Sequence, residues 1–332
     1  MSTIFHRDGS VYITALGGDR RCIRVVLNDA QRFMQFATCE TRYDLPLIKR
    51  ILDVKGPEYL CDEILRDEDP YYIAHHLQTT LLSFSPRSFF TDKRLLDFGC
   101  GSGASTMILG RMFARTQIVG VDINQRFLDI AQERARLHAL NRITFLQNPS
   151  GDTLPNKIGL FDVIVLSAVF EHLLPPERPT LIRLLWSHLK RGGILFFDET
   201  PHRFFPIESH TSGLPLINYF PDWLAHLCVR LFSKRDIRRD SWQELLRKGI
   251  RGGTEREIVE LIRRAGGVPV CLPPTAPTIR NPIDLWYEGY ARHATGRAGW
   301  IKQKMRIPLR LVYRLTGLSL VPYLSIAFRK KS

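Results

Sequence analysis

Short apolar runs and amphipathic stretches alternate through the middle of the chain. The apolar runs have the length of strands and lie at residues 95–98, 118–121, 143–146, 161–166, 194–197 and 268–272. Stretches with helical periodicity lie between them at residues 104–113, 124–135, 179–189 and 254–265. Because strands and helices alternate at this spacing, the pattern predicts βα units and a parallel sheet.

Local signals set several boundaries of these elements. Asn124 is expected to cap its helix, and Thr254 to cap another with Glu257 as its capping-box partner. The pair Gly192-Gly193 is expected to break a helix before the strand at 194–197.

The sequence before and after these alternating strands and helices predicts additional segments. Residues 1–90 read as an N-terminal accessory segment, with β-prone runs around a Gly-Gly-Asp turn and a helical stretch from 45 to 82 that is interrupted at Gly56-Pro57. Residues 91–332 then form the main domain. It contains an excursion at 200–250, rich in histidine, proline and aromatic residues, and a basic insert at 273–318.

Charge changes the interpretation of the insert. The chain has 47 basic and 33 acidic residues, a formal net charge of +14, and no acidic residue follows Glu288. The basic residues beyond that point are Arg292, Arg297, Lys302, Lys304, Arg306, Arg310, Arg314, Arg329, Lys330 and Lys331. A cationic helix over 301–316, interrupted by Pro308, is compatible with a solvated surface helix, with peripheral membrane contact through residues 296–316, or with an RNA-binding stripe.

Other compositional features predict a cytoplasmic protein. The six cysteines are scattered without metal-ligand spacing, no apolar leader is present, and no apolar run reaches the length of a membrane span.

The densest chemical signal is the segment Asp97-Phe-Gly99-Cys100-Gly101-Ser-Gly103, which leaves a strand and opens a helix. Glycines allow a sharp turn and a close approach of a ligand to bare backbone, although a tight strand–helix connection would use them too. Asp122 ends the next strand, where a carboxylate can accept hydrogen bonds from both hydroxyls of an adenosine ribose. The G-x-G-x-G spacing departs from the G-x-G-x-x-G of dinucleotide sites.

These motifs resemble those of the class I S-adenosylmethionine-dependent methyltransferases. The resemblance rests on LLDFGCGSG, VGVDIN, FDVIVLSAVFEHL and LKRGGILFFDE, which together cover about residues 90–200. It implies an α/β fold with a Rossmann-like, seven-stranded, mostly parallel sheet, helices on both faces and an antiparallel last strand, which SLVPYLSIAFRK at 319–330 resembles.

The resemblance also implies S-adenosylmethionine as the cofactor and assigns residues to it. Asp97, Gly99, Cys100, Gly101 and Gly103 would surround its amino-acid end. Asp122 would bind the ribose, Ile123 would pack on the adenine face, and Ser167 would border the sulfonium. The adenine amine would be bound by Asn148, Ser150 or Asp152. The family's Gly-Asp pair after the third strand sits late here, at Gly151-Asp152, so these last three residues compete for one role.

Candidate catalytic residues follow the fourth and fifth strands. His172 is the first candidate base, because its unperturbed pKa suits proton transfer near neutrality, and Glu171 would orient it or bind a metal. His210 is the second candidate base, although Glu171 and His172 could instead only order their loop. No metal-ligand motif is present, so no metal is predicted.

The sequence therefore predicts a methyltransferase that acts on an oxygen of a small or lipid-linked acceptor such as a sugar, a phenol or quinol, or a lipid-linked glycan. An RNA methyltransferase that uses the basic insert and a non-catalytic cofactor-binding protein are the alternatives. The signatures of DNA base methylation are absent, which makes nucleic acid the weaker partner. The sequence predicts neither the acceptor nor the oligomeric state.

Overall fold

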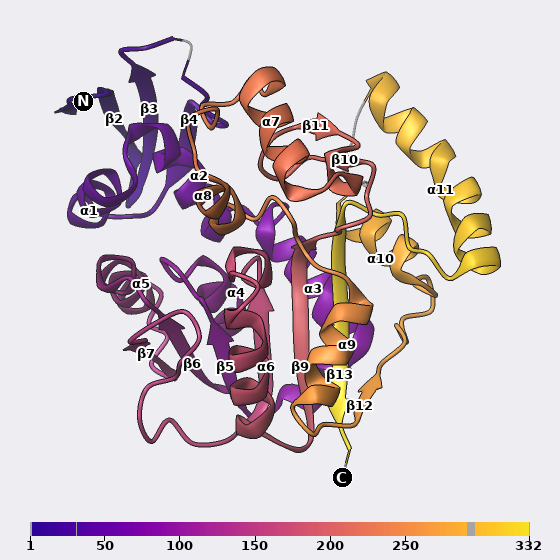
Figure 1. The fold of residues 1–332 in the computed structure, drawn as a ribbon. Coiled ribbons are helices and arrows are strands. Elements are labelled where there is room, and N and C mark those ends of the chain that lie inside the picture. The colour runs from indigo at the N-terminus through magenta and orange to yellow at the C-terminus, as the bar shows by residue number, and fades with distance from the viewer. Residues whose placement is uncertain (1, 31, 291–295, 332) are drawn as a thin grey trace.

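The centre of the molecule is a seven-stranded sheet with the order β12-β13-β9-β8-β5-β6-β7. A computed structural model describes residues 2–30, 32–290 and 296–331 (Figure 1). The strands are β5 (Arg94–Phe98), β6 (Gln117–Asp122), β7 (Ile143–Gln147), β8 (Phe161–Ser167), β9 (Leu189–Pro201), β12 (Pro269–Cys271) and β13 (Tyr323–Lys330). Strands β5 to β9 pair in parallel, whereas β13 is antiparallel to both of its neighbours. The predicted Rossmann-like sheet with an antiparallel last strand is confirmed.

Both faces of the sheet are covered because its central strands are apolar on both sides. Alternate residues of each strand enter different cores, so Leu96 and Ile164 face one core and Leu95 and Val163 face the other. The helices α6 (Glu177–His188) and α9 (Glu255–Arg264) cover the first core. The second core is covered by α3 (Ile73–Phe84), α4 (Ala104–Met112) and α10 (Pro282–Gly289), and α5 (Gln125–Leu137) packs on β6 and β7.

Two local predictions were wrong. Strand β9 begins at Leu189, directly after α6, and Gly192 lies inside it with φ 75° where the pairing with β8 shifts register. The two glycines therefore form an irregularity within a strand and do not break a helix before one. Thr254 caps α9 by accepting the N–H of Glu257 at 3.0 Å, but the Glu257 carboxylate pairs with Arg178 at 2.7 Å and does not complete a capping box.

The N-terminal segment has a core of its own. Its four antiparallel strands are β1 (Ser2–His6), β2 (Gly9–Gly17), β3 (Arg20–Leu27) and β4 (Thr38–Thr41). They pack with α1 (Leu45–Lys55) and α2 (Pro57–Glu68), which are separated at Gly56 as predicted. Helix α3 packs instead into the core of the large sheet, so the predicted domain boundary at residue 90 stays a prediction.

The excursion and the insert lie toward the carboxyl ends of the parallel strands (Figure 1). The excursion contains β10 (Ile207–Glu208), β11 (Leu214–Pro215), α7 (Asp222–Phe232) and α8 (Trp242–Arg247), and η3 (Ile217–Tyr219) lies between β11 and α7. The insert contains α10 and α11 (Gly296–Thr316), which confirms the predicted cationic helix with Pro308 inside it. Short 3-10 turns occur at η1 (Arg87–Phe90) and η2 (Phe170–His172). Arg292, one of the predicted basic residues, lies outside the described residues.

Candidate cofactor and active site

The glycine loop after β5 has a backbone that only glycine adopts readily. Gly99, Gly101 and Gly103 have φ of 72°, 54° and 85°. A Cβ at Gly99 would lie 2.6 Å from Val169 Cγ2, and one at Gly103 would lie 2.6 Å from Ala131 Cβ. A Cβ at Gly101 would meet no atom within 4 Å. Two of the glycines therefore permit close packing, while Gly101 leaves the backbone open to a ligand.

Asp122 is held rigidly at the end of β6. Its Oδ2 accepts the N–H of Gly101 at 2.9 Å, and its Oδ1 accepts the N–H of Asn124 at 2.9 Å. A carboxylate offers about four acceptor positions, so each oxygen keeps one for a further donor. This arrangement fits the predicted pair of ribose hydroxyls.

A cavity of about 500 Å³ lies beside Asp122 and is called the first cavity here. It is lined by Phe98, Gly99, Val121, Asp122, Ile123, Asn148, Gly151, Ala168, Val169, His172, Leu173 and Arg247. Asn148 is buried, and its Oδ1 has no hydrogen-bond partner among the described residues. Ser150 donates to Asp152 at 2.8 Å, and neither residue lines the cavity. Of the three candidates for the adenine amine, the geometry therefore favours Asn148.

A second cavity, of about 310 Å³, adjoins the first at Gly99 and Ala168. It is lined by Lys55, Tyr59, Asp62, Glu63, Arg66, Ile73, Gly99, Cys100, Gly101, Ser102, Ala104, Ser105, Ser167, Ala168 and Glu199. The predicted residues Cys100, Gly101 and Ser167 are thus brought together with side chains of the N-terminal segment. The ammonium of Lys55, the guanidinium of Arg66 and the carboxylate of Asp62 offer partners of both signs for an amino acid. Sequence reasoning missed these three residues.

A buried ion pair joins the N-terminal segment to the glycine loop. The guanidinium of Arg134 donates to the carbonyls of Ser102 at 3.0 Å and of Glu63 at 2.7 Å, and Ser102 Oγ donates to the Glu63 carboxylate. Burial alone would raise the pKa of Glu63, but Arg134 and Lys55 outweigh it and lower this pKa to about 2. The loop and helix α2 are therefore coupled by a largely buried ion pair.

Asp97 and Gly103 lie outside both cavities. The Asp97 Oδ2 accepts from Thr106 at 2.6 Å and from Ser105 at 3.0 Å, which ties the end of β5 to α4. Burial raises the pKa of Asp97 to about 6. Contact of these two residues with the cofactor stays a prediction.

The structure brings Glu171, His172 and His210 together. One ligand atom of each lies within 4.8 Å of the others. His172 Nδ1 is 2.7 Å from the carbonyl oxygen of Arg247, so Nδ1 carries the proton and Nε2 is free, 3.8 Å from Glu171 Oε1. Neither carboxylate oxygen of Glu171 has a hydrogen-bond partner among the described residues, and burial raises the pKa of Glu171 to about 8. Burial lowers the pKa of His172 and takes that of His210 to about 4.

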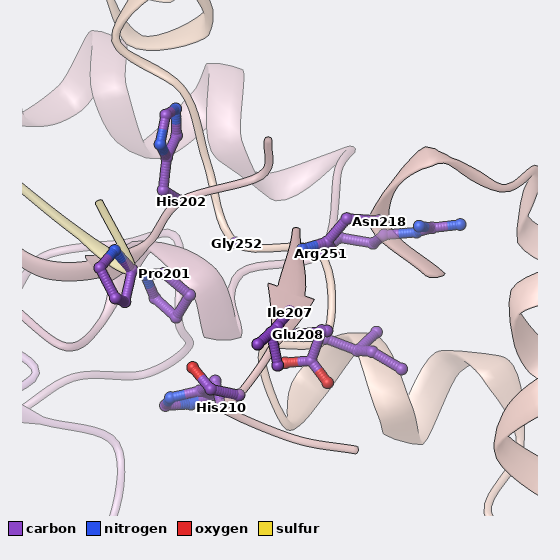
Figure 2. Close-up of a pocket in the computed structure, with 11 residues that line it drawn as sticks. Pro201, His202, Ile207, Glu208, His210, Asn218, Arg251 and Gly252 are labelled. Carbon is purple, nitrogen blue, oxygen red and sulfur yellow. The ribbon is translucent and has the colours of Figure 1, made fainter. Parts of the chain in front are cut away.

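The three residues therefore form an uncharged cluster at neutral pH. Only His172 among them borders the first cavity. The three side chains could also hold a divalent cation, and the prediction of no metal stays a prediction. His210 lines a separate pocket, in which Figure 2 shows His202 directed away from Glu208 and His210. With a volume of about 10 Å³, that pocket has room for no more than a water molecule.

A hydrogen-bonded chain of side chains ends at Glu199, which lines the second cavity. Glu199 has φ 54°, an unusual conformation for a residue with a side chain, and its Oε1 accepts from Tyr290 Oη at 2.7 Å. Tyr290 Oη lies 3.0 Å from His76 Nε2, which lies 3.0 Å from Asp198 Oδ1. Burial alone would lower the pKa of His76 and raise that of Asp198, but their mutual attraction reverses both shifts, so the two form a buried ion pair.

The comparisons with known proteins agree with this geometry. A family model described as a methyltransferase domain matches residues 95–193, which run from β5 into β9. The demethylmenaquinone methyltransferase of Lactococcus lactis is 28% identical over 182 residues, 54% of this chain and 68% of the relative.

Two further relatives with different names match shorter parts of this chain. The carboxy-S-adenosyl-L-methionine synthase of Campylobacter curvus is 25% identical over 105 residues, 32% of this chain and 43% of the relative. The ubiquinone biosynthesis O-methyltransferase of Colwellia psychrerythraea is 26% identical over 130 residues, 38% of this chain and 50% of the relative. This chain thus spans about half the length of these two relatives. The family match, the sheet order and the glycine loop show that residues 95–193 belong to a methyltransferase domain of the class I type, whose cofactor is S-adenosylmethionine.

Proposed function

We propose that this protein transfers a methyl group from S-adenosylmethionine to an oxygen of a small or lipid-linked acceptor. The observation that carries the proposal is the junction of the two cavities at Gly99 and Ala168. The first cavity offers Asp122 and Asn148 to an adenosine, and the second offers charged groups to an amino acid. When bound, the cofactor supplies an electrophilic methyl group on a sulfonium.

The second cavity also contains a group that can take a proton from a hydroxyl. Glu199 lines it together with Ser167, and because Tyr290 occupies its Oε1, its Oε2 is left to accept. A backbone in the left-handed region costs about 1–3 kcal/mol, and such strain is concentrated at functional sites. We therefore add Glu199 to the candidate bases His172 and His210.

The name of one relative supports an oxygen acceptor, and the names of two support a quinone-related one. One is a ubiquinone biosynthesis O-methyltransferase and another a demethylmenaquinone methyltransferase. Their low identity to this chain leaves the acceptor open among phenols, quinols, sugars and lipid-linked glycans.

Methyl-labelled S-adenosylmethionine tests this function. Purified protein is incubated with a cell extract and, separately, with purified RNA, and the products are divided into organic-phase, small-molecule and RNA fractions. We expect label in the organic-phase or small-molecule fraction. Label in RNA would refute the proposed acceptor class, and the absence of label from every fraction would favour a non-catalytic binding protein.

Paired variants identify the base once an acceptor is known. Glu199→Gln should lower kcat by about 10²–10⁴-fold, the range for loss of a general base. His172→Gln serves as the matched comparison, because His172 borders the other cavity. A loss of kcat in His172→Gln but not in Glu199→Gln would assign the base to His172.

A further inference from the structure

Helix α11 presents several large apolar side chains to solvent and two of its arginines to the protein. Leu309 and Tyr313 pack on the buried residues of α10. Arg306 and Arg310 point in the same inward direction, and both pair with the buried carboxylate of Asp284. An ordinary surface helix has the opposite arrangement, with its apolar stripe inward and its charges outward.

The opposite side of the helix is an apolar stripe without a partner among the described residues. Trp300, Ile307, Leu311 and Leu315 are 65%, 71%, 56% and 76% exposed. Their spacings of seven, four and four residues place them on one face of an α-helix. These four residues are called the outer face of α11.

Positive charge accompanies this outer face. Lys304 and Arg314 are exposed and share it by helical spacing, and Lys304 Nζ lies 5.6 Å from the centre of the Trp300 ring. No acidic residue follows Glu288 in the chain. An apolar stripe flanked by lysine and arginine is the pattern of helices that lie in the interface of an anionic bilayer.

A second exposed apolar group occurs on α7, whose exposed residues are Trp223, Leu227, Leu231 and Phe232. Figure 1 shows α7 and the first turns of α11 at the same end of the molecule, where the parallel strands finish. Two separate helices that reach that end thus each expose large apolar side chains. No helix of the described residues is long and apolar enough to cross a membrane.

We propose that the outer face of α11 binds the surface of an anionic lipid bilayer, with α7 as a second contact. Trp300, Ile307, Leu311 and Leu315 would enter the boundary between headgroups and acyl chains, while Lys304 and Arg314 would remain among the headgroups. A second copy of this chain is a poorer occupant of this face, because each copy carries a net charge of +14 and the two would repel. The proposal does not depend on which acceptor is methylated.

Co-sedimentation of the full-length protein with vesicles tests the proposal. The probes are vesicles of phosphatidylcholine alone and of phosphatidylcholine with phosphatidylglycerol, each at low and high salt. We expect binding to the anionic vesicles, weaker binding at high salt, and little binding to the neutral ones. The triple variant I307S/L311S/L315S should bind at least about tenfold more weakly.

A matched control separates the outer face from general surface hydrophobicity. The variant F5S/L16S/V26S removes three exposed apolar side chains from the N-terminal sheet and should bind vesicles like the wild type. Unchanged thermal unfolding and unchanged binding of S-adenosylhomocysteine show that each variant is folded. Three results would overturn the proposal: no binding of the wild type to anionic vesicles, equal binding of the α11 variant, or a wild-type dimer that the α11 variant converts to a monomer without any vesicle binding.

Discussion

Replacing Glu171 with glutamine measures how much its buried carboxyl group destabilises the folded protein when the pH favours ionisation. Glu171 is fully enclosed, and neither of its oxygens has a hydrogen-bond partner among the described residues. Burial raises its pKa from 4.5 to about 8. Glutamine has nearly the shape of the protonated carboxyl and cannot ionise, so Glu171→Gln changes the titration and little else.

The size of the effect follows from the raised pKa. The folded protein keeps a proton on Glu171 up to about pH 8, whereas the unfolded chain releases it near pH 4.5. Between these values the folded state binds more protons, so its stability falls as the pH rises, by about 1.4 kcal/mol per pH unit. We expect the two proteins to be similarly stable at pH 5, and the variant to be more stable by about 3–4 kcal/mol at pH 8.

Urea unfolding monitored by tryptophan fluorescence between pH 5 and pH 9 measures this difference. Glu260→Gln, on the exposed side of α9, is the control for the loss of a carboxylate outside the cluster. If the difference between wild type and Glu171→Gln were constant with pH, Glu171 would be ionised in the folded protein and the neutral cluster with the histidines would be refuted.

Three further substitutions test separate parts of the structure. Gly103→Ala should lower the stability measured by urea unfolding by about 2 kcal/mol or more, because its Cβ would lie 2.6 Å from Ala131 Cβ at φ 85°; an unchanged midpoint would contradict that packing. Arg134→Met should lower it by about 3 kcal/mol, because the variant loses one of two cationic partners of the buried Glu63 carboxylate and the hydrogen bonds to the carbonyls of Ser102 and Glu63; a loss below about 1 kcal/mol would mean that this ion pair is not formed. Tyr290→Phe removes the hydrogen bond that holds the Glu199 carboxylate in place, so kcat should fall; an unchanged kcat would argue against Glu199 as the base.

The centre of the fold was predictable because its signals are local. The strands of the large sheet that pair in parallel coincide with apolar runs of the sequence, and Asn124 and Thr254 cap their helices as expected. Predictions failed where a residue interacts with a part of the chain that is distant in the sequence. Glu257 pairs with Arg178 instead of completing a capping box, and the glycines at 192 and 193 fit a register shift against β8.

The residues of the candidate site were also predictable only where they follow predicted strands. Gly99, Asp122, Asn148 and Ser167 follow strands that were predicted, and they line the two cavities. The Glu199 chain could not be predicted, since its members come from α3, the end of β9 and the end of α10 and meet only in three dimensions. Lys55 and Arg66 were missed for a related reason, because the folding of the N-terminal segment onto the glycine loop depends on a buried ion pair.

Calorimetric titration with S-adenosylhomocysteine tests the central claim most directly. We predict that the wild type binds it and that Asp122→Ala weakens binding by about 1.5–3 kcal/mol, roughly 10- to 150-fold, through loss of charge-assisted hydrogen bonds. Asp152→Ala, whose carboxylate engages Ser150 outside the cavity, should bind like the wild type. A wild type that binds neither S-adenosylhomocysteine nor S-adenosylmethionine, or an Asp122→Ala variant with undiminished affinity, would contradict the account.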